Sequence, residues 1–401
     1  MNRSVVVTGM GVISPIGNSI GEFRESLRQG KSGEGEITRF DAKKFPVKRA
    51  CEVRNFTPTW RTKILDPFIQ YAFSAAEQAV EDAKLELEKI DPYRVGVVMG
   101  SSKGGITTFE KTREKFGSYL PSALHSAALY ASFPPHIASQ WIAKRFAIMG
   151  NAKCYSTACA TGTYSILEGV RMVREGEIDY CIAGATDASI TQLLLAGYNS
   201  MKVYSRKGRM CPYDKAHDGF LVGEGAGVVI LESKESAKAR RVPYYAEVLA
   251  SDYRSDGVSL LHYLREAHGL SNLIGRTLQK ANVTPQDLDY INTHGTSTRE
   301  GDRYEASELR HALNSFAEQI PMSSTKSMTG HMLGASGAIE FIASCLSVKE
   351  KWIHPTIRLE KPDTECDLDF VPNKMREKHV KIALSYSLAF GGHMAAILIK
   401  E

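Results

Sequence analysis

Cysteine and histidine side chains stand in three short segments of the chain that are rich in glycine and small polar residues. The first is STACATG (residues 156–162), and apolar residues recur at helical spacing just after it, between residues 166 and 173. A thiol at a helix N-terminus faces unpaired backbone N–H groups and the positive end of the helix dipole, which both lower its pKa. The small neighbours leave room for a bulky group at the sulfur. Cys159 is therefore a candidate nucleophile.

The two histidine segments are THGTST (residues 293–298) and KSMTGHMLGA (residues 326–335). They contain His294, Lys326 and His331, and Glu340 follows shortly after. A single histidine in such a loop is more often structural than functional, but two of them together with a candidate nucleophile favour a catalytic site. A neutral imidazole can donate a hydrogen bond from one nitrogen while a neighbour holds the other. The remaining histidines show no ligand spacing with cysteine or acidic residues, so we expect no metal.

Taken with further motifs, these segments resemble those of β-ketoacyl-acyl-carrier-protein synthases of the elongating class, within the thiolase-fold condensing enzymes. The other motifs that carry the resemblance are VVVTGMGVISPIGN (5–18), DK (214–215), DGF (218–220), GEGAG (223–227) and FGG (390–392). Each is weak alone, whereas the set in the family's order is specific. The resemblance implies an acyltransferase that condenses an acyl group on Cys159 with malonyl-acyl-carrier-protein, with loss of CO2, in fatty acid biosynthesis.

The resemblance also implies a role for each site residue. Cys159 would hold the acyl chain, and its backbone N–H would form an oxyanion hole with that of Phe390. His294 and His331 would donate Nε2–H to the malonyl thioester carbonyl and stabilise the enolate left by decarboxylation. Lys326 would position His331 and tune the local field. Glu340 would hold the loop by hydrogen bonds.

Substrate and partner contacts follow from the same resemblance. The pantetheine arm and acyl chain would meet Thr293, Thr296, Thr298, Phe390 and Gly391. Phe109 would close the acyl pocket and favour short, medium or flat unsaturated chains, unless its ring points into the core. The acidic carrier protein would dock on a basic patch formed by Arg61, Lys63, Lys202, Arg206, Lys207 and Arg209. We expect a homodimer, and no cofactor, because the pair of glycines at 9 and 11 lacks the third glycine and helix context of a dinucleotide loop.

The C-terminal loop departs from the family. Ala389 replaces a glycine, and His393 and Met394 replace a threonine and an asparagine, while Cys211 stands where an arginine is usual. A ketosynthase of a polyketide or other secondary-metabolite pathway, which could pair with a different subunit, therefore stays open as an alternative. So does a non-catalytic interaction subunit. A degradative thiolase is disfavoured because no second cysteine lies in a suitable C-terminal setting.

Composition sets broad limits on the class of protein. A chain of 401 residues exceeds the usual size of one domain, and 43% hydrophobic with 24% charged residues is ordinary for a globular protein. No apolar run is long enough to span a membrane, and no signal peptide precedes the first strand-like run. Seven cysteines without a CxxC pair favour reduced thiols in the cytoplasm. The net charge of +5 suits an acidic protein partner and is far from a nucleic-acid signature.

The elements that must position these residues alternate between strand and helix. Strand-like runs at 5–8, 95–100, 180–184 and 291–294 are separated by helical stretches such as 68–84 and 270–281, which predicts an α/β protein with largely parallel sheets. Residues 223–232 resemble residues 390–399, each a glycine-rich turn feeding a strand, which indicates a duplication. We divide the chain into halves 1–242 and 243–401. The resemblance implies a thiolase-like fold, with duplicated βαβαβαββ halves in an αβαβα layered arrangement.

Overall fold

The computed structural model describes residues 3–58, 64–116, 129–263 and 267–401. Ten strands form one sheet in the order β10-β9-β13-β14-β8-β1-β7-β6-β4-β5. The strands of the N-terminal half are β1 (Val5–Ile13), β4 (Val95–Gly100), β5 (Ala152–Lys153), β6 (Tyr180–Asp187) and β7 (Gly225–Ser233). Those of the C-terminal half are β8 (Ala246–Ser255), β9 (Tyr290–Asn292), β10 (Met322–Ser323), β13 (Ile382–Leu388) and β14 (His393–Lys400).

The two halves repeat the same topology. From the outer edge of the sheet inward, each half places its strands in the chain order third, second, fourth, fifth, first. The halves meet where Val5–Val7 of β1 pairs antiparallel with Ala246–Val248 of β8. The two strands whose sequences resemble each other, β7 and β14, are the fifth strands of their halves. The predicted duplication is thereby confirmed.

The sheet is more antiparallel than the sequence suggested. Parallel pairing joins β4 to β5 and β6, and β9 to β10 and β13. The five central pairs, from β13–β14 across to β7–β6, are antiparallel. Parallel neighbours need a crossover such as a helix, and alternation in a sequence reports only these crossovers. The pattern does not show that the last strand of each half, β7 or β14, pairs antiparallel with the first strand of that half.

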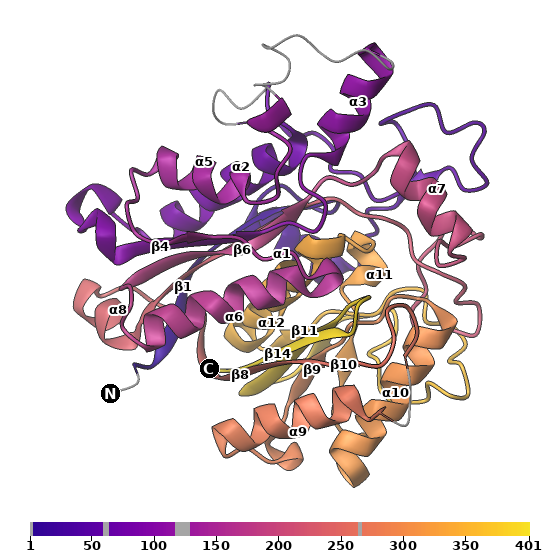
Figure 1. The fold of residues 1–401 in the computed structure, drawn as a ribbon. Coiled ribbons are helices and arrows are strands. Elements are labelled where there is room, and N and C mark those ends of the chain that lie inside the picture. Colours follow the sequence, from indigo (N-terminus) through magenta and orange to yellow (C-terminus); the bar gives the residue numbers. More distant parts are fainter. Residues whose placement is uncertain (1–2, 59–63, 117–128, 264–266) are drawn as a thin grey trace.

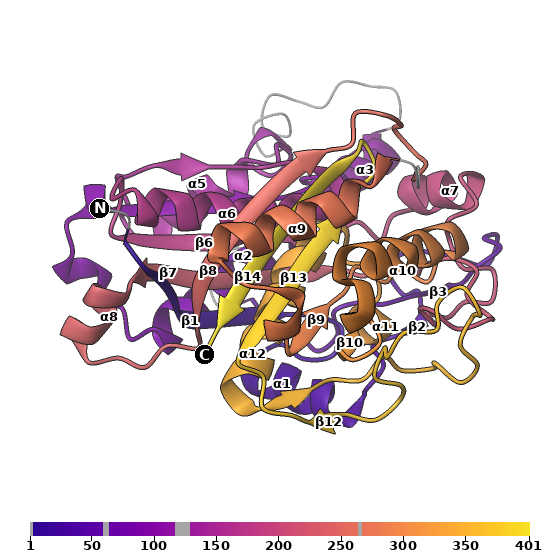
Figure 2. The same cartoon turned by 90° about the horizontal axis from the view of Figure 1, so that it is seen from below.

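The helices form three layers around the two halves of the sheet. Figure 1 shows α6 and α12 between the halves, α2 and α5 over the outer face of the first half, and α9 and α10 over that of the second. Figure 2, which views the molecule from below, shows α9 lying across β8 and β14. These helices are α2 (Pro67–Asp82), α5 (Ile137–Arg145), α6 (Thr161–Arg174), α9 (Gly269–Ala281), α10 (Arg299–Leu313) and α12 (Ser336–Glu350). The arrangement is the αβαβα layering of a thiolase-like fold.

The two central helices approach each other closely at their N-terminal ends. A Cβ atom at Gly162 of α6 would lie 2.5 Å from the backbone nitrogen of Ala338, and one at Gly337 of α12 would lie 2.3 Å from Oγ1 of Thr163. Only glycine fits at both positions. Residues 336–348 of α12 are buried on every side, as expected for a helix enclosed between two sheets. This contact brings the segment before α6, which carries Cys159, against the segment before α12, which carries His331.

Smaller elements complete the described part of the chain. They are the helices α1 (Ile20–Gln29), α3 (Ile106–Phe116), α7 (Gln192–Ser200), α8 (Lys234–Arg240) and α11 (Lys326–Thr329), and two sheets of two strands each, β2 (Gly35–Glu36) with β3 (Arg49–Ala50) and β11 (Trp352–Ile353) with β12 (Arg376–Glu377). All seven cysteines are free thiols. Among the helices of the described ranges, none is long and apolar enough to cross a membrane.

Candidate active site

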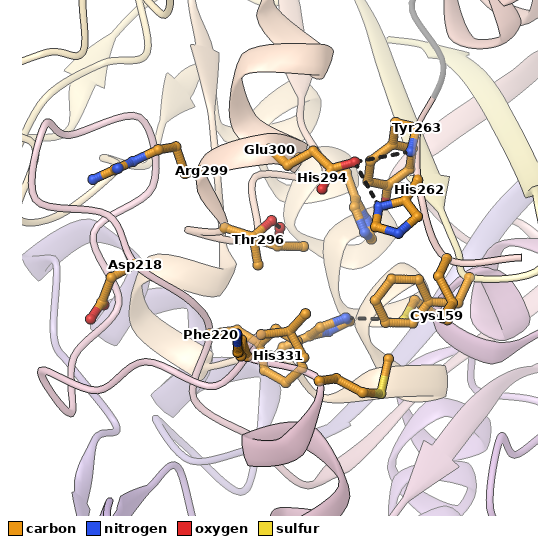
Figure 3. A pocket seen from close by; sticks show the side chains of 17 residues that line it. Cys159, Asp218, Phe220, His262, Tyr263, His294, Thr296, Arg299, Glu300 and His331 are labelled. Atoms are coloured by element: carbon orange, nitrogen blue, oxygen red, sulfur yellow. Dashed lines mark hydrogen bonds and ion pairs between the residues drawn. The ribbon is translucent and has the colours of Figure 1, made fainter. Parts of the chain in front are cut away.

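Cys159 lies in a short 3₁₀ turn, Ala158–Ala160, that leads directly into α6. Its side chain is only 8% exposed and faces a cavity of about 410 Å³. His294 and His331 line the same cavity from loops that belong to the C-terminal half, as Figure 3 shows. The structure thus brings the three predicted catalytic side chains to one place.

His331 contacts the sulfur directly. Its Nε2 lies 3.1 Å from Sγ of Cys159. Its Nδ1 accepts the backbone N–H of Leu333 at 3.3 Å and lies 3.0 Å from Oγ of Ser336. Because a backbone N–H can only donate, Nδ1 is unprotonated and the proton of the neutral ring sits on Nε2. His331 therefore directs an N–H donor toward the sulfur and the cavity.

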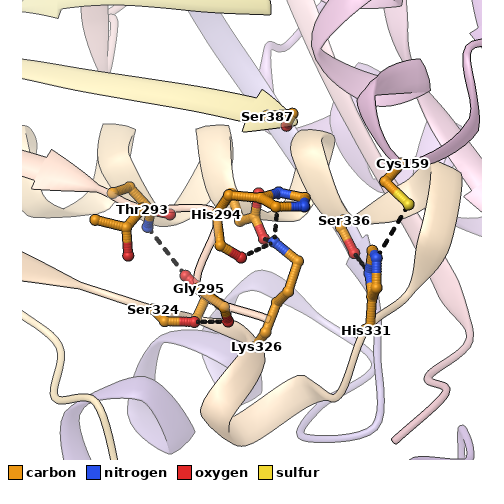
Figure 4. Close-up of polar contacts among 12 residues, drawn as sticks. Cys159, Thr293, His294, Gly295, Ser324, Lys326, His331, Ser336 and Ser387 are labelled. Atoms are coloured by element: carbon orange, nitrogen blue, oxygen red, sulfur yellow. Dashed lines mark hydrogen bonds and ion pairs between the residues drawn. The ribbon is translucent and has the colours of Figure 1, made fainter. Parts of the chain in front are cut away.

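Lys326 holds His294 and not His331, which corrects the role expected from its place five residues before His331. Its Nζ lies 3.2 Å from Nδ1 and 2.6 Å from the carbonyl oxygen of His294, and it forms an ion pair with Glu340 (Figure 4). An ammonium group has three N–H donors and no acceptor, so these three contacts use all of them. Nδ1 of His294 must then accept, which leaves the proton on Nε2.

A buried carboxylate supports the backbone of the His294 loop. Glu305 of α10 accepts the N–H groups of His294 and Gly295 at 2.6 and 2.8 Å, and the hydroxyls of Tyr213 and Tyr386 at 2.8 and 2.7 Å. Burial, with the nearby charge of Asp302, raises the pKa of Glu305 to about 7, and the hydrogen bonds from Tyr386, Tyr213 and Gly295 oppose the rise. None of these three side chains was predicted from the sequence. Glu305 could have been noticed as an acidic residue on the buried face of α10, four positions before Leu309.

Burial controls protonation throughout the site. It lowers the pKa of His294 well below the usual value for histidine, and Lys326 and His331 lower it further. Burial, with Lys326 as the second cause, does the same for His331. Both rings are therefore neutral at physiological pH. Burial also raises the pKa of the Cys159 thiol to about 11, although Lys326 opposes the rise. The expectation of a lowered cysteine pKa was wrong, since desolvation of the thiolate outweighs the effect of the nearby Lys326 and Lys103.

The expected substrate contacts divide into two groups. Thr296, Thr298 and Phe390 line the cavity, and the two threonine hydroxyls lie 2.8 Å apart. Thr293 and Gly391 are not among the lining residues. Thr293 is fully buried, and its Oγ1 lies 2.8 Å from the hydroxyl oxygen of Tyr213 and 3.2 Å from the carbonyl oxygen of Ser323. Its hydroxyl is therefore committed to the protein interior.

Phe109 lies away from this cavity. It belongs to α3, is 39% exposed and packs against Phe133 with the ring centres 5.4 Å apart. It does not line the 410 Å³ cavity that contains Cys159. Its place at the end of an acyl pocket stays a prediction.

One residue of the predicted basic patch lines the cavity. Lys202 is exposed and lines the cavity, and Arg206, Lys207 and Arg209 are exposed on the segment that follows it. Nζ of Lys207 donates to the carbonyl of Ala216 at 2.9 Å, which fixes its side chain near the same loop. The other two members, Arg61 and Lys63, lie outside the described residues. Arg299 at the start of α10 also lines the cavity, and the sequence analysis did not include it.

The residues that the structure describes include no group of three or more histidine, cysteine or acidic side chains arranged to hold a metal ion. A cysteine that faces two neutral histidines, at the junction of duplicated α/β halves, is a site suited to thioester chemistry. The fold and the site together define a condensing enzyme of the thiolase-like class. Comparison with known proteins identifies the family.

The chain belongs to the β-ketoacyl synthase family. Residues 2–237 match the N-terminal domain of β-ketoacyl synthases, and residues 245–360 match the C-terminal domain. The chain is 37% identical to 3-oxoacyl-[acyl-carrier-protein] synthase 2 of Coxiella burnetii and 38% identical to the protein of the same name from Staphylococcus aureus strain COL. Both alignments cover 100% of this chain and 99% of the relative.

Solved structures of ketosynthases share the fold over the whole chain. The ishigamide ketosynthase/chain length factor superposes with a TM-score of 0.92 at 31% identity, over 100% of this chain and 99% of the other. A type II polyketide ketosynthase solved with its acyl-carrier protein, AntDE:AntF, gives 0.92 at 30% identity with the same coverage. A β-ketoacyl synthase from Burkholderia phymatum gives 0.91 at 27% identity, and each chain is covered fully.

Proposed function

We propose that the protein is a β-ketoacyl-acyl-carrier-protein synthase that extends an acyl chain by decarboxylative Claisen condensation in fatty acid biosynthesis. One observation carries the proposal: a buried cysteine shares its cavity with two neutral histidines, and each histidine has its Nδ1 held by a donor. The full-length similarity to 3-oxoacyl-[acyl-carrier-protein] synthases supports the choice of reaction.

The first half-reaction loads the enzyme. The sulfur of Cys159 attacks the thioester carbonyl of an acyl carrier protein, the bond between that carbonyl and the carrier's sulfur breaks, and the thiol proton of Cys159 passes to the departing sulfur. Nε2–H of His331, 3.1 Å from the sulfur, stabilises the developing thiolate that burial disfavours. The backbone N–H groups of Cys159 and Phe390 stabilise the tetrahedral oxyanion; such a hole contributes about 3–4 kcal/mol.

The second half-reaction forms the new carbon–carbon bond. The malonyl thioester loses CO2, and the electron pair of the broken bond passes to the thioester carbonyl as an enolate. Nε2–H groups of His294 and His331 donate to that oxygen, and neither ring needs to change its protonation state to do so. The enolate carbon attacks the acyl group on Cys159. Collapse of the intermediate breaks the bond between the acyl carbon and Cys159, which releases a 3-oxoacyl carrier protein, and the thiolate of Cys159 takes up a proton from the solvent.

Several further assignments belong to the same proposal. Lys326 and Glu340 act as a buried pair that orients His294, and Thr296 and Thr298 contact the pantetheine arm at the cavity entrance. The acidic carrier protein docks on the basic patch that includes Lys202 and Arg206. Residues 1–242 and 243–401 form the two halves. The enzyme acts in the cytoplasm as a homodimer.

A ketosynthase of a polyketide or other secondary-metabolite pathway is the second candidate. The altered C-terminal loop favours it: Ala389 is buried, and the ring of His393 packs edge-on against Tyr164 at 5.9 Å, close to the loop of Phe390. The type II polyketide ketosynthase among the similar structures is consistent with this candidate.

Intact-protein mass spectrometry separates these functions. The protein is incubated with a mixture of acyl carrier proteins, and the acyl group trapped on Cys159 is weighed before and after malonyl carrier protein is added. A saturated acyl adduct that is converted to a 3-oxoacyl carrier protein with release of CO2 is expected for fatty acid elongation. A preference for polyunsaturated or polyketo chains supports the second candidate. No adduct and no CO2 release refutes both and leaves a non-catalytic subunit.

A further inference from the structure

A buried carboxylate joins the two halves behind the catalytic histidines. Asp187, the last residue of β6, is fully buried, and it accepts hydrogen bonds from both sides. From the N-terminal half come the hydroxyls of Ser101 at 2.9 Å and Ser102 at 2.6 Å, and the backbone N–H groups of Ser102 and Lys103 at 3.2 Å each. From the C-terminal half comes the backbone N–H of Gly334 at 2.6 Å.

Every partner of Asp187 in this set is a donor. An ionised carboxylate only accepts, so the set matches the charged form of Asp187 with no polar contact left mismatched. The contact with Gly334 is also tight in space, because a Cβ at Gly334 would lie 2.6 Å from Oδ2 of Asp187 and 2.9 Å from the nitrogen of Ser102. The carboxylate therefore fixes the backbone of Gly334 relative to β6.

Gly334 directly follows the residue that sets the proton on His331. Leu333 directs its N–H at Nδ1 of His331 from an unusual backbone conformation, with φ at +50°. For a residue other than glycine this conformation is strained and needs support from its surroundings. Asp187 binds the N–H of the next residue, Gly334, and so holds the backbone in place one residue after Leu333. The backbone of His331 itself is held separately, by Leu221 and Gly223 at 2.8 Å each.

We propose that Asp187 is a positioning residue for His331: by holding the N–H of Gly334, it keeps the N–H of Leu333 aimed at Nδ1 and so keeps the catalytic proton on Nε2. Asp187 does not line the cavity, so it acts on the reaction only through the loop. The proposal rests on the proposed function for the step in which Nε2–H is used. The placement of the proton itself can be measured without any turnover.

The test compares Asp187→Asn with Asp66→Asn in the full-length protein. Asp66 is an equally buried carboxylate of the N-terminal half that also accepts two backbone N–H groups, from Phe68 and Thr108, but it does not contact the histidine loops. The side-chain amide in Asp187→Asn has one oxygen that accepts and one NH2 group that cannot. The N–H of Gly334 therefore loses its acceptor. We expect kcat for CO2 release from malonyl carrier protein to fall about 10–100-fold with KM unchanged, since a small misplacement of a reacting group has an effect of this size. Asp66→Asn should keep the wild-type kcat.

Nitrogen-15 NMR of histidine-labelled protein reports the tautomer, with the His331 signals assigned by their loss in His331→Ala. The wild type should show protonated Nε2, and Asp187→Asn should show a mixture of tautomers. A fall in kcat without a tautomer change, or no change in either compared with Asp66→Asn, overturns the proposal. If the wild type releases no CO2, the proposed function fails while the tautomer comparison still decides the role of Asp187.

A second variant covers the case in which Asp187→Asn does not fold. Ser336→Ala removes the other partner of Nδ1 and leaves Leu333 in place. The Nε2–H tautomer should persist in this variant, because the N–H held through Gly334 is sufficient. A tautomer that switches to Nδ1 in Ser336→Ala, or a wild type with the proton already on Nδ1, overturns the proposal.

Discussion

His331 Nε2 lies 3.1 Å from Sγ of Cys159, although the two residues are 172 positions apart and belong to different halves of the fold. The contact depends on the close approach of α6 and α12 at Gly162 and Gly337. The duplicated topology therefore has a direct chemical consequence. One half supplies the candidate nucleophile, and the other supplies the two imidazole donors that share its cavity.

Replacement of the nucleophile should separate the two half-reactions. Cys159→Ala leaves no sulfur to carry an acyl group, so we expect condensation to be abolished. Release of CO2 from malonyl carrier protein should remain measurable, because His294 and His331 are unchanged. Product analysis by mass spectrometry and a CO2 assay check the two parts. Condensation at a wild-type rate in this variant would show that another residue is the nucleophile.

The two histidines should differ in their effect on the thiol. His294→Ala and His331→Ala should each lower decarboxylation about 10²–10³-fold, since removal of one oxyanion donor typically has this effect. Only His331→Ala should also slow alkylation of Cys159 by iodoacetamide, because His331 alone of the two contacts the sulfur.

His379→Ala is the control for these variants, as this ring is partly exposed and pairs with Glu401 at the C-terminus. This variant should change neither the rate of decarboxylation nor the rate of alkylation of Cys159. Equal alkylation rates in His294→Ala and His331→Ala would contradict the assignment of distinct roles.

The buried cation beside His294 should set the pH dependence. In the wild type both histidines are neutral well below pH 6.5, so decarboxylation should stay constant from pH 7.5 to 6. Lys326 lowers the pKa of His294, so its removal raises that pKa and moves the acid limb toward neutral pH. The double variant Lys326→Met/Glu340→Gln removes the cation without leaving a buried charge unpaired. An acid limb that does not move in this variant would contradict the role of Lys326.

Stability measurements accompany that experiment. Lys326→Met alone leaves Glu340 buried and unpaired and should lower the free energy of unfolding by about 3–5 kcal/mol, whereas the double variant should lose less. The depressed pKa values also predict a pH effect. Below pH 6.5 the histidines of the unfolded chain take up protons, whereas buried His294 and His331 do not. The free energy of unfolding should therefore decrease by about 1.4 kcal/mol per ring for each unit by which the pH is lowered. Urea titrations at pH 7.5 and 5.5 measure both effects.

Positive charge on the segment that follows Lys202 should control binding of the acyl carrier protein. Arg206→Glu should raise KM for the acyl carrier protein and weaken its salt dependence, because charges at the rim of an interface act mainly on association rate. Lys238→Glu makes the same change of charge on α8, outside the cavity, and serves as the control. Identical KM values for the two variants would refute the docking patch.

Chain length tests the remaining sequence prediction. If Phe109 closes the acyl pocket, Phe109→Ala should shift the preference toward longer acyl carrier substrates, as each buried methylene contributes about 0.8 kcal/mol. The measurement is kcat/KM over a ladder of chain lengths, with the exposed Tyr93→Ala as control. An unchanged profile would show that Phe109 is not the pocket floor.

Much of the site could be read from residue types and order. The small-residue setting of Cys159 and the paired histidine loops indicated a thiol and two donors, and the repeat of residues 223–232 at 390–399 indicated duplicated halves. From the sequence, Lys326 was expected to position His331, but it contacts His294. Lys326 opens the short helix α11, and the chain then turns at Gly330, where φ is +70°, so the lysine reaches His294 and His331 faces the sulfur. Proximity along the chain was a poor guide to proximity in space.

The sequence by itself determined the family and the alternation that builds an α/β fold, and it singled out three candidate reactive side chains, because these depend on residue types and their order. Only the tertiary structure decided how those side chains are protonated. Burial raises the pKa of Cys159 and lowers those of both histidines, since a charge loses solvation inside a closed core. Lys326, the donor that selects the tautomer of His294, becomes its neighbour only when the two histidine loops fold against one another, and the N–H of Leu333 reaches His331 only in the folded turn after it.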